Sequence, residues 1–464
     1  MPPRLALLVC LSGVALLILQ DLRWGRKVQL ADCVPLVWVL IVGSRPVSSW
    51  FGATPIDNLD GSPTDRLVHQ LLIFGGLWIL LARRIDWRHF LAANKFVVFY
   101  FVYCGISILW SDYPWVSLKR WTKDAGVLVM VLVVVSEQQP LASVKAVLVR
   151  CAYVLVPISV VLAKYFPDIG RAYDRWTGAV VYVGASGSKN LLGMTLTVCG
   201  LALSWAFVSL LDEPRGRKRT QQALVYAALL GMTVWVLGRA QSATATLCLC
   251  VGVFVLVLLR VRRVAENLWA WLAAGVLSSV ILLLAGGAFL PDGLLGLLGR
   301  DASLTGRTAI WRTVLSEDIN PFVGVGFSSF WIRDRAARLS ADYYYGLNEA
   351  HSGYLETYLN GGVIGLALLL ALLGNVVIRS LRGVAGQEEK DVHRFAAAVV
   401  ILAAIYGITE AVFSRLDLVW FVLVLVAVVP PTRRDGRARP RSDGQHVSHR
   451  RNPPNPLFSP PHRG

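Results

Sequence analysis

Long uncharged apolar runs constrain the possible folds of this chain more than any other feature. Residues 223–237 and 243–259 contain no acidic or basic side chain. A helix of about 20 mostly apolar residues crosses the hydrocarbon core of a bilayer. The whole chain of 464 residues is 55% hydrophobic and only 16% charged, which is too few charges for a soluble protein of this length. The sequence therefore predicts one large membrane-embedded helical bundle.

We predict an all-α, polytopic transmembrane bundle over residues 1–430, with about 12–13 spans. The first apolar run is expected to be a span, because no clear signal-peptide cleavage site follows it. The predicted spans are residues 5–20, 28–43, 67–82, 96–110, 125–136, 146–166, 189–211, 222–238, 241–259, 267–290, 353–378, 395–411 and 417–430.

Basic residues predict the orientation of this bundle. If the loop at 212–220 (DEPRGRKRT) is cytoplasmic, alternation of the spans places more than half of the 46 Lys and Arg residues on the cytoplasmic side. This agrees with the excess of Lys and Arg in the cytoplasmic loops of membrane proteins. Residues 111–124 fit less well, because they place three basic residues on the outer side. We expect a multi-pass protein of a bacterial inner membrane.

Two long polar segments are also predicted. The extracytoplasmic segment 291–352 contains apolar residues at positions 310, 311, 314 and 315, the spacing of an amphipathic helix. That helix is expected to lie on the membrane surface or on the bundle, and to end before Asn320 and Pro321. Residues 431–464 are rich in Pro, Arg, Ser and His, and predict a disordered, basic cytoplasmic tail.

The net charge of +17 does not indicate a nucleic-acid-binding protein. The basic residues lie in the tail or flank apolar runs, where they set topology and attract anionic lipid headgroups. The seven Cys residues show neither the spacing of a metal site nor a disulfide framework. We therefore expect membrane lipids as partners, and no metal, cofactor or nucleic acid.

Three arginines lie on the predicted outer side of the membrane. Arg239 occupies a tight turn between two strongly apolar segments, where it can bind a phosphate or simply reach the lipid headgroups. Arg307 precedes the predicted amphipathic helix and Arg312 lies within it, and each can instead belong to its solvated face. Arginine binds phosphate groups through paired hydrogen bonds, so these residues are candidates for holding a diphosphate.

Four other ionisable residues lie at or inside the predicted spans. His351 precedes the span 353–378, and on a helix it would share a face with Tyr354 and Tyr358. Its imidazole can accept a proton from a sugar hydroxyl, or it can be an interfacial histidine. Glu356 is a rival base, Lys189 is shallow enough to reach the headgroups, and Glu410 can pair with Arg415 or line a cavity.

Eight short segments follow one another in a characteristic order. They are 42–50 (VGSRPVSSW), 61–66 (GSPTDR), 187–193 (GSKNLLG), 239–245 (RAQSATA), 306–311 (GRTAIW), 321–327 (PFVGVGF), 351–356 (HSGYLE) and 361–365 (GGVIG). In this order they resemble the O-antigen ligase and polymerase superfamily, and within it the exopolysaccharide-production branch. Two departures from the family pattern are Ser352, where the family usually has Asn after the histidine, and Trp311, where it has an aliphatic residue.

The resemblance implies a glycosyl transfer from an undecaprenyl-diphosphate-linked oligosaccharide to an acceptor glycan or glycolipid. Arg239 and Arg307 would bind the diphosphate, and His351 would act as, or position, the general base. The reaction would be metal-independent and inverting, and would belong to the polymerisation or ligation of a surface polysaccharide, alongside other polysaccharide-assembly proteins. Arg312, Lys189, Glu356 and Glu410 are secondary candidates.

Two rival functions remain open. A secondary transporter or flippase of a lipid-linked glycan would have ionisable groups near the bilayer midplane and inverted repeats. The ionisable candidates here lie at the predicted outer boundary instead, and no such repeat is evident. A non-catalytic scaffold would not need a long outer segment containing arginines and a histidine at the start of a span.

Overall fold

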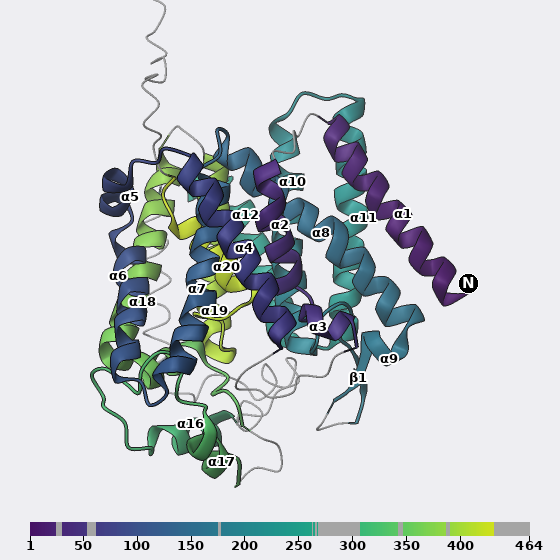
Figure 1. The fold of residues 1–464 in the computed structure, drawn as a ribbon. Coiled ribbons are helices and arrows are strands. Elements are labelled where there is room, and N and C mark those ends of the chain that lie inside the picture. The colour runs from purple at the N-terminus through teal and green to yellow at the C-terminus, as the bar shows by residue number, and fades with distance from the viewer. Residues whose placement is uncertain are drawn as a thin grey trace, which may run out of the picture.

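The computed structural model is an all-α bundle, as predicted (Figure 1). It describes residues 1–24, 30–52, 62–174, 178–261, 263–264, 267, 307–341, 347–386 and 390–430. Residues 268–290 of the predicted span 267–290, residues 291–306 of the predicted outer segment and the predicted tail 431–464 lie outside the described residues.

Every other predicted span coincides with a helix. Within the described residues, the only strands are the antiparallel pair β1 (Arg171–Tyr173) and β2 (Val180–Tyr182), which the sequence did not predict. The helices are α1 (Pro3–Arg23), α2 (Leu30–Val42), α3 (Val47–Trp50), α4 (Pro63–Ala82), α5 (Trp87–Ala93), α6 (Lys95–Ile106), η1 (Ser107–Trp110), α7 (Pro114–Val135), α8 (Pro140–Tyr165), α9 (Pro167–Gly170), α10 (Lys189–Ser209), η2 (Leu210–Asp212), α11 (Arg217–Ala240), α12 (Ala243–Leu258), α16 (Arg307–Leu315), α17 (Arg333–Ala341), α18 (Gly353–Ala385), α19 (Lys390–Thr409) and α20 (Leu418–Ala427).

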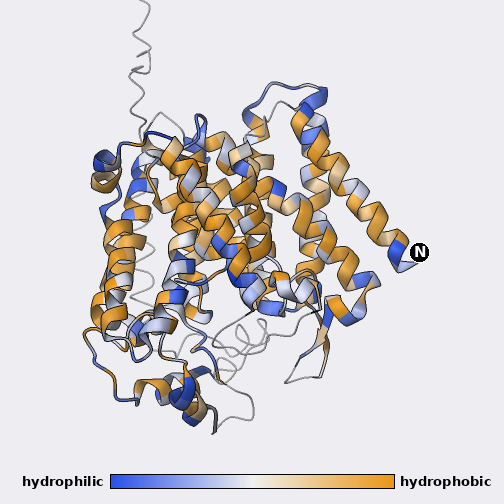
Figure 2. Ribbon diagram, in the orientation of Figure 1, coloured by the Kyte–Doolittle hydropathy of each residue, from blue (hydrophilic) through white to orange (hydrophobic). Residues whose placement is uncertain are grey.

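Seven described helices are long and apolar enough to cross a membrane, and an eighth span is possible if the bent pair of α5 with α6 and η1 counts as one. The apolar helices α2, α12 and α20 are shorter. Apolar residues dominate the bundle in Figure 2, and polar residues gather at its two ends. The chain is therefore a multi-pass membrane protein, and the total of 12–13 spans stays a prediction.

The helices differ in how deeply they are packed. Every residue of α20 is buried, which fits its wholly apolar sequence. Helices α1 and α4 instead expose large apolar residues such as Leu16 and Trp78, a surface suited to lipid. Small residues allow close approach between elements, since a Cβ atom at Gly126 would lie 2.7 Å from Trp38. The core therefore lies around α8, α10 and α20.

Two buried ion pairs join helices at the end of the bundle away from α16 and α17. Arg150 of α8 lies 2.9 Å from the Asp21 carboxylate of α1, and both side chains are at most 3% exposed. Arg83, which follows α4, pairs with Glu137, which follows α7. Because a buried charge is costly unless it is paired, these contacts hold the helices in one arrangement.

Helices α16 and α17 lie at the other end of the bundle, which we call the site end (Figure 1). Ile310 and Val314 of α16 are buried against Phe330, Leu339 and other apolar residues. The predicted amphipathic helix is thereby confirmed, and its apolar face packs on protein. It ends at Leu315, several residues before the predicted stop at Asn320 and Pro321.

One local prediction was wrong. His351 is not on a helix face with Tyr354 and Tyr358, because α18 begins at Gly353 and His351 has φ of +50°. Ser352 is the N-cap of α18, and its hydroxyl accepts a hydrogen bond from the backbone of Leu355 at 3.4 Å. The serine that departs from the family pattern therefore caps the helix, as an asparagine also would.

Candidate functional site

A buried carboxylate, Glu410, organises the candidate site at the end of α19. Glu410 Oε1 lies 3.0 Å from Nη2 of Arg307. The Nη1 atom of the same arginine donates to the carbonyl of Thr409. Glu410 Oε2 accepts a 3.3 Å hydrogen bond from the amide of Asn190, at the start of α10. The Glu410 carbonyl accepts a 2.9 Å hydrogen bond from Gly353, so the same residue fixes the first turn of α18.

His351 lies beside two carboxylates. Its Nδ1 atom is 2.9 Å from Glu349 Oε1 and 3.8 Å from Glu410 Oε2. We call Arg307, Glu349, His351 and Glu410 the His351 cluster. It unites two of the residues that the sequence singled out, Arg307 and His351, through a third, Glu410.

The cluster shifts the protonation of its own members. Burial works to lower the pKa of His351, but the carboxylates of Glu349 and Glu410 outweigh it and raise that pKa to about 9. Burial works to raise the pKa of Glu349, but His351, Arg415 and Arg307 outweigh it and lower that pKa to about 2. The ion pair of His351 and Glu349 is therefore charged at neutral pH. This ion pair is lost as the pH rises through 9 or falls through 2.

Helix α16 also positions the residue before His351. The indole nitrogen of Trp311 donates a 2.9 Å hydrogen bond to the carbonyl of Ala350. Trp311 is the second departure from the family pattern, and an aliphatic side chain could not form this bond. The indole therefore ties α16 to the histidine segment in addition to the contact of Arg307.

Arg415, in the loop between α19 and α20, extends the network beyond the His351 cluster. Its Nη1 lies 2.7 Å from Glu349 Oε2, and its Nη2 lies 3.8 Å from Glu356 Oε1. Glu410 pairs with Arg307, so the suggested pairing of Glu410 with Arg415 was wrong. The contacts form a chain from Arg307 through His351 and Arg415 to Glu356.

Glu356 has a mainly structural environment. Its Oε1 atom accepts hydrogen bonds from the backbone of Ala350 at 2.6 Å and from the indole of Trp331 at 2.7 Å. These bonds pin the histidine segment and the segment before α17 to the first turn of α18. This carboxylate is therefore better placed to hold the site together than to accept a proton.

Arg239 lies at the same end of the bundle but outside the His351 cluster. It is exposed near the end of α11, and the following turn leads into α12, whose Thr244 hydroxyl lies 3.4 Å from that of Thr409. Among the described residues, no hydrogen bond or ion pair involves the Arg239 side chain. Its guanidinium group is therefore available to an outside anion.

The other two sequence candidates lie apart from the cluster. Arg312 is exposed on α16, and its side chain forms no hydrogen bond or ion pair within the described part of the chain. Lys189 pairs with Asp174, which follows β1, so its charge is used locally. Its neighbour Asn190, which the sequence did not single out, is the residue of that motif that reaches Glu410.

Three side chains of the cluster could together hold a metal ion. Ligand atoms of Glu349, His351 and Glu410 all lie within 4.8 Å of one another. Both carboxylates already pair with arginines, however, so a cation here would have to compete with Arg307 and Arg415. The donor set therefore favours an internal ion-pair network.

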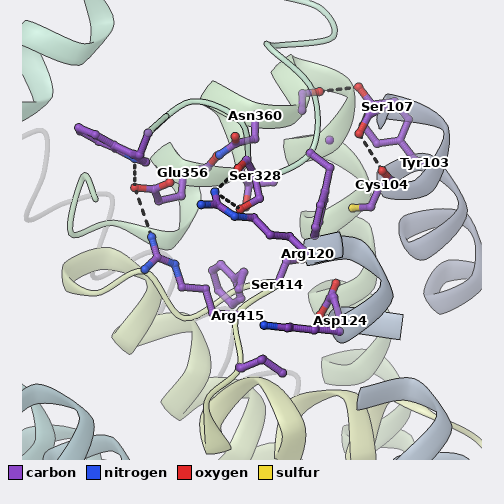
Figure 3. Close-up of a pocket in the computed structure, with 18 of the residues that line it drawn as sticks. Tyr103, Cys104, Ser107, Arg120, Asp124, Ser328, Glu356, Asn360, Ser414 and Arg415 are labelled. Carbon is purple, nitrogen blue, oxygen red and sulfur yellow. Dashed lines mark hydrogen bonds and ion pairs between the residues drawn. The ribbon is translucent and has the colours of Figure 1, made fainter. Parts of the chain in front are cut away.

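A cavity of about 840 Å³ opens beside the cluster, and sequence reasoning missed it (Figure 3). It is lined by α6, α7, the first turns of α18, residues 327–336 and the loop after α19. Arg120 and Lys123 of α7 line it, and so do Glu356 and Arg415. The one sequence signal was the excess of basic residues at 119–123 on the predicted outer side.

Backbone strain is also concentrated at the site end. Every described non-glycine residue with positive φ lies there, and each such residue costs of order 1–3 kcal/mol. His351 is in the cluster, Gln241 follows the Arg239 helix, and the other three line the cavity. These residues are Gln241, Ser328, Arg333, His351 and Ser414, with φ between 45° and 53°.

Comparison with known proteins points to the same class as the sequence motifs. Residues 225–370 match the model of a family described as O-antigen ligase, and this range contains Arg239, Arg307 and His351. Over these residues the chain is similar to the O-antigen ligase family, as its motifs indicated.

A curated relative supports the branch. The chain is 28% identical over 334 residues to the exopolysaccharide production protein ExoQ of Rhizobium meliloti (strain 1021). The match covers 69% of this chain and 73% of the relative. Together, the family and the relative indicate a role in polysaccharide assembly.

Proposed function

We propose that this protein transfers an oligosaccharide from undecaprenyl diphosphate to an acceptor hydroxyl, as a polymerase or ligase of a surface polysaccharide. The supporting observation is that Arg307 and His351 share one carboxylate, Glu410, at one end of a membrane bundle. An arginine, which can bind a phosphate, near a histidine, which can accept a proton, supports glycosyl transfer from a lipid diphosphate.

In this mechanism Arg307 and the exposed Arg239 bind the donor diphosphate. The acceptor oxygen attacks the anomeric carbon, the bond from that carbon to the diphosphate oxygen breaks, and undecaprenyl diphosphate leaves with the bonding electrons. Neutral His351 takes the proton of the acceptor hydroxyl. Attack opposite the leaving group inverts the anomeric configuration.

The arginines offset the charge that develops on the leaving diphosphate, so the proposed reaction is metal-independent. Diphosphate binding to Arg307 also weakens the hold of that arginine on Glu410. The site end faces the extracytoplasmic side of the bacterial inner membrane in this proposal, where lipid-linked glycans and other polysaccharide-assembly proteins meet it. The partners are the lipid-linked donor, an acceptor glycan or glycolipid, and the surrounding lipids.

The test uses purified protein in lipid vesicles with a synthetic undecaprenyl-diphosphate oligosaccharide and excess chelator. We expect longer glycans and released undecaprenyl diphosphate, and loss of both with Arg307→Ala. The exposed Arg312→Ala on the same helix is the matched control and should remain active. Movement of intact donor between leaflets, without release of lipid diphosphate, would identify a flippase and refute the transferase.

A further inference from the structure

The cavity introduced above, which we call the Arg120 cavity, is separate from the His351 cluster but linked to it. Neither Arg307 nor His351 lines it. Arg415 joins the two, because it lines the cavity and pairs with Glu349 of the cluster. The volume of the cavity, about 840 Å³, falls within the range of about 300–1,000 Å³ that is typical of ligand pockets.

The lining of the Arg120 cavity carries more positive than negative charge. Two carboxylates, those of Asp124 and Glu356, line it. The lining cations are Arg120, Lys123, Arg333 and Arg415.

Two of these cations have no acidic partner. In the described residues, neither Lys123 nor Arg333 forms a hydrogen bond or ion pair with a carboxylate. The contact found for the Arg333 guanidinium is the ring of Tyr113, 5.7 Å away. Arg120 donates to the carbonyl of Ser328 at 2.5 Å, and the nearby Glu356 carboxylate acts on its charge. A concave site with unneutralised cations attracts an anionic ligand.

The remaining lining suits a saccharide. Tyr100 and Ser414, whose hydroxyl oxygens lie 2.8 Å apart, add polar groups to the wall of the cavity. Aromatic side chains, among them Trp331 and Tyr103, supply flat apolar surface. Binding pockets combine such surface with a few convergent polar groups.

The backbone provides a second, independent observation. Ser328, Arg333 and Ser414 all have positive φ and all line the cavity. Strain of this kind persists where the surrounding structure holds a residue in place, and it clusters at ligand-binding sites. Arg333 thus has an imposed position at the start of α17.

We propose that the Arg120 cavity binds a carboxylate-bearing saccharide segment of the acceptor glycan, with Lys123 and Arg333 recognising the carboxylate. That the ligand is the acceptor rests on the proposed function, which assigns the donor diphosphate to Arg307 and Arg239. Along the chain of contacts from Arg307 through His351 to Arg415, the cavity adjoins Arg415 and not Arg307. An acceptor held there presents its terminal hydroxyl toward His351.

The test measures binding, without donor, to the full chain in nanodiscs of a zwitterionic lipid. The probes are a galacturonic acid trisaccharide and the matched trisaccharide whose carboxyl groups are reduced to alcohols. Calorimetry should show at least about tenfold weaker binding of the neutral sugar, as expected for the loss of one charge-assisted contact. This comparison uses the unaltered protein, so it holds even if a variant fails to fold.

Variants then locate the site. Lys123→Gln and Arg333→Gln should each weaken binding of the acidic trisaccharide toward that of the neutral one. Arg338→Gln is the matched control, because Arg338 lies on the same helix as Arg333 and is likewise exposed, but does not line the cavity. Equal binding of both sugars, no binding of either, or equal loss with Arg338→Gln would overturn the proposal. Since no donor is present, failure of the transfer reaction cannot produce any of these results.

Discussion

The two ends of the bundle use charged residues differently. Away from the site end, buried charges of neighbouring helices pair directly, as Arg150 does with Asp21, whose side chains are 3% and 0% exposed. At the site end, carboxylates are shared among several partners, and Glu410 alone contacts Arg307, Asn190 and His351. The cations Arg239 and Lys123 have no carboxylate partner there among the described residues.

This difference separates stabilising charges from charges available for chemistry. A closed buried pair offers nothing to a ligand, and breaking it leaves an uncompensated charge. A shared carboxylate can exchange one partner for another when a ligand binds. The positive-φ residues reinforce the contrast, because all those in the described chain lie at the site end. The first end holds the bundle together, and the second is arranged to bind and react.

The largest expected effect is on turnover and comes from His351. His351→Ala should lower glycan transfer by about 10²–10⁴-fold, the usual contribution of a general acid–base group. Its side chain is partly exposed, so the protein should still insert and unfold near the temperature of the unaltered chain. The measurement is the rate of undecaprenyl diphosphate release per folded molecule. If His351→Ala released undecaprenyl diphosphate at the normal rate, His351 would not be the general base.

The opposite pattern is expected for Asp21, at the other end. Asp21→Asn leaves Arg150 buried without its carboxylate and should destabilise the protein by about 3–5 kcal/mol. Transfer per folded molecule should stay unchanged. Thermal unfolding in detergent gives the stability, and the release assay gives the rate. A large fall in rate at constant stability would contradict the division between the two ends.

Sequence reasoning identified the helices because apolar length and helical periodicity are local properties. It also found Arg307 and His351, which lie in family motifs, and the buried face of α16, set by residues four apart such as Ile310 and Val314. The β1–β2 pair escaped notice because each strand has only three residues.

The partners of these residues could not be predicted, because they are distant in the chain. Asn190 and Glu410 are 220 residues apart, and Arg415 and Glu349 are 66 apart. The pairing of Glu410 with Arg415 was plausible from their proximity in sequence, but the fold turns Arg415 toward Glu349. The cavity was missed for the same reason, since packing alone brings Arg120 of α7 to α18.

A smaller effect, on the pH dependence, sharpens the role of shared carboxylates. Because the pKa of His351 is raised to about 9, the imidazole is protonated at neutral pH in the free protein. If the neutral form is the base, kcat/KM should rise about tenfold per pH unit below 9 and level off above it. Glu410→Gln removes one of the negative charges that raise the pKa of His351. The rising part of the profile, its acid limb, should therefore move to lower pH.

The measurement is the pH profile of kcat/KM for the two proteins, with Asp21→Asn as a control that leaves the cluster intact. An acid limb that stays in place in Glu410→Gln would show that another group titrates. A profile of the unaltered protein that is flat between pH 6 and 9 would exclude neutral His351 as the base.

The smallest predicted effect tests whether a single hydrogen bond to the shared carboxylate matters. Asn190→Ala removes the 3.3 Å bond to Glu410 Oε2 and leaves both charges of the Arg307 pair. A hydrogen bond contributes about 1 kcal/mol, so transfer should fall about fivefold. The neighbouring Lys189→Ala is the matched control, because it breaks only the pair with Asp174. If Asn190 positions Glu410, Asn190→Ala should lower kcat and shift the pH at which kcat/KM levels off, which reports the pKa of His351. A general packing defect would lower only the melting temperature, and Lys189→Ala can have that effect. Equal rates for the two variants would mean that Arg307 alone holds Glu410 in place.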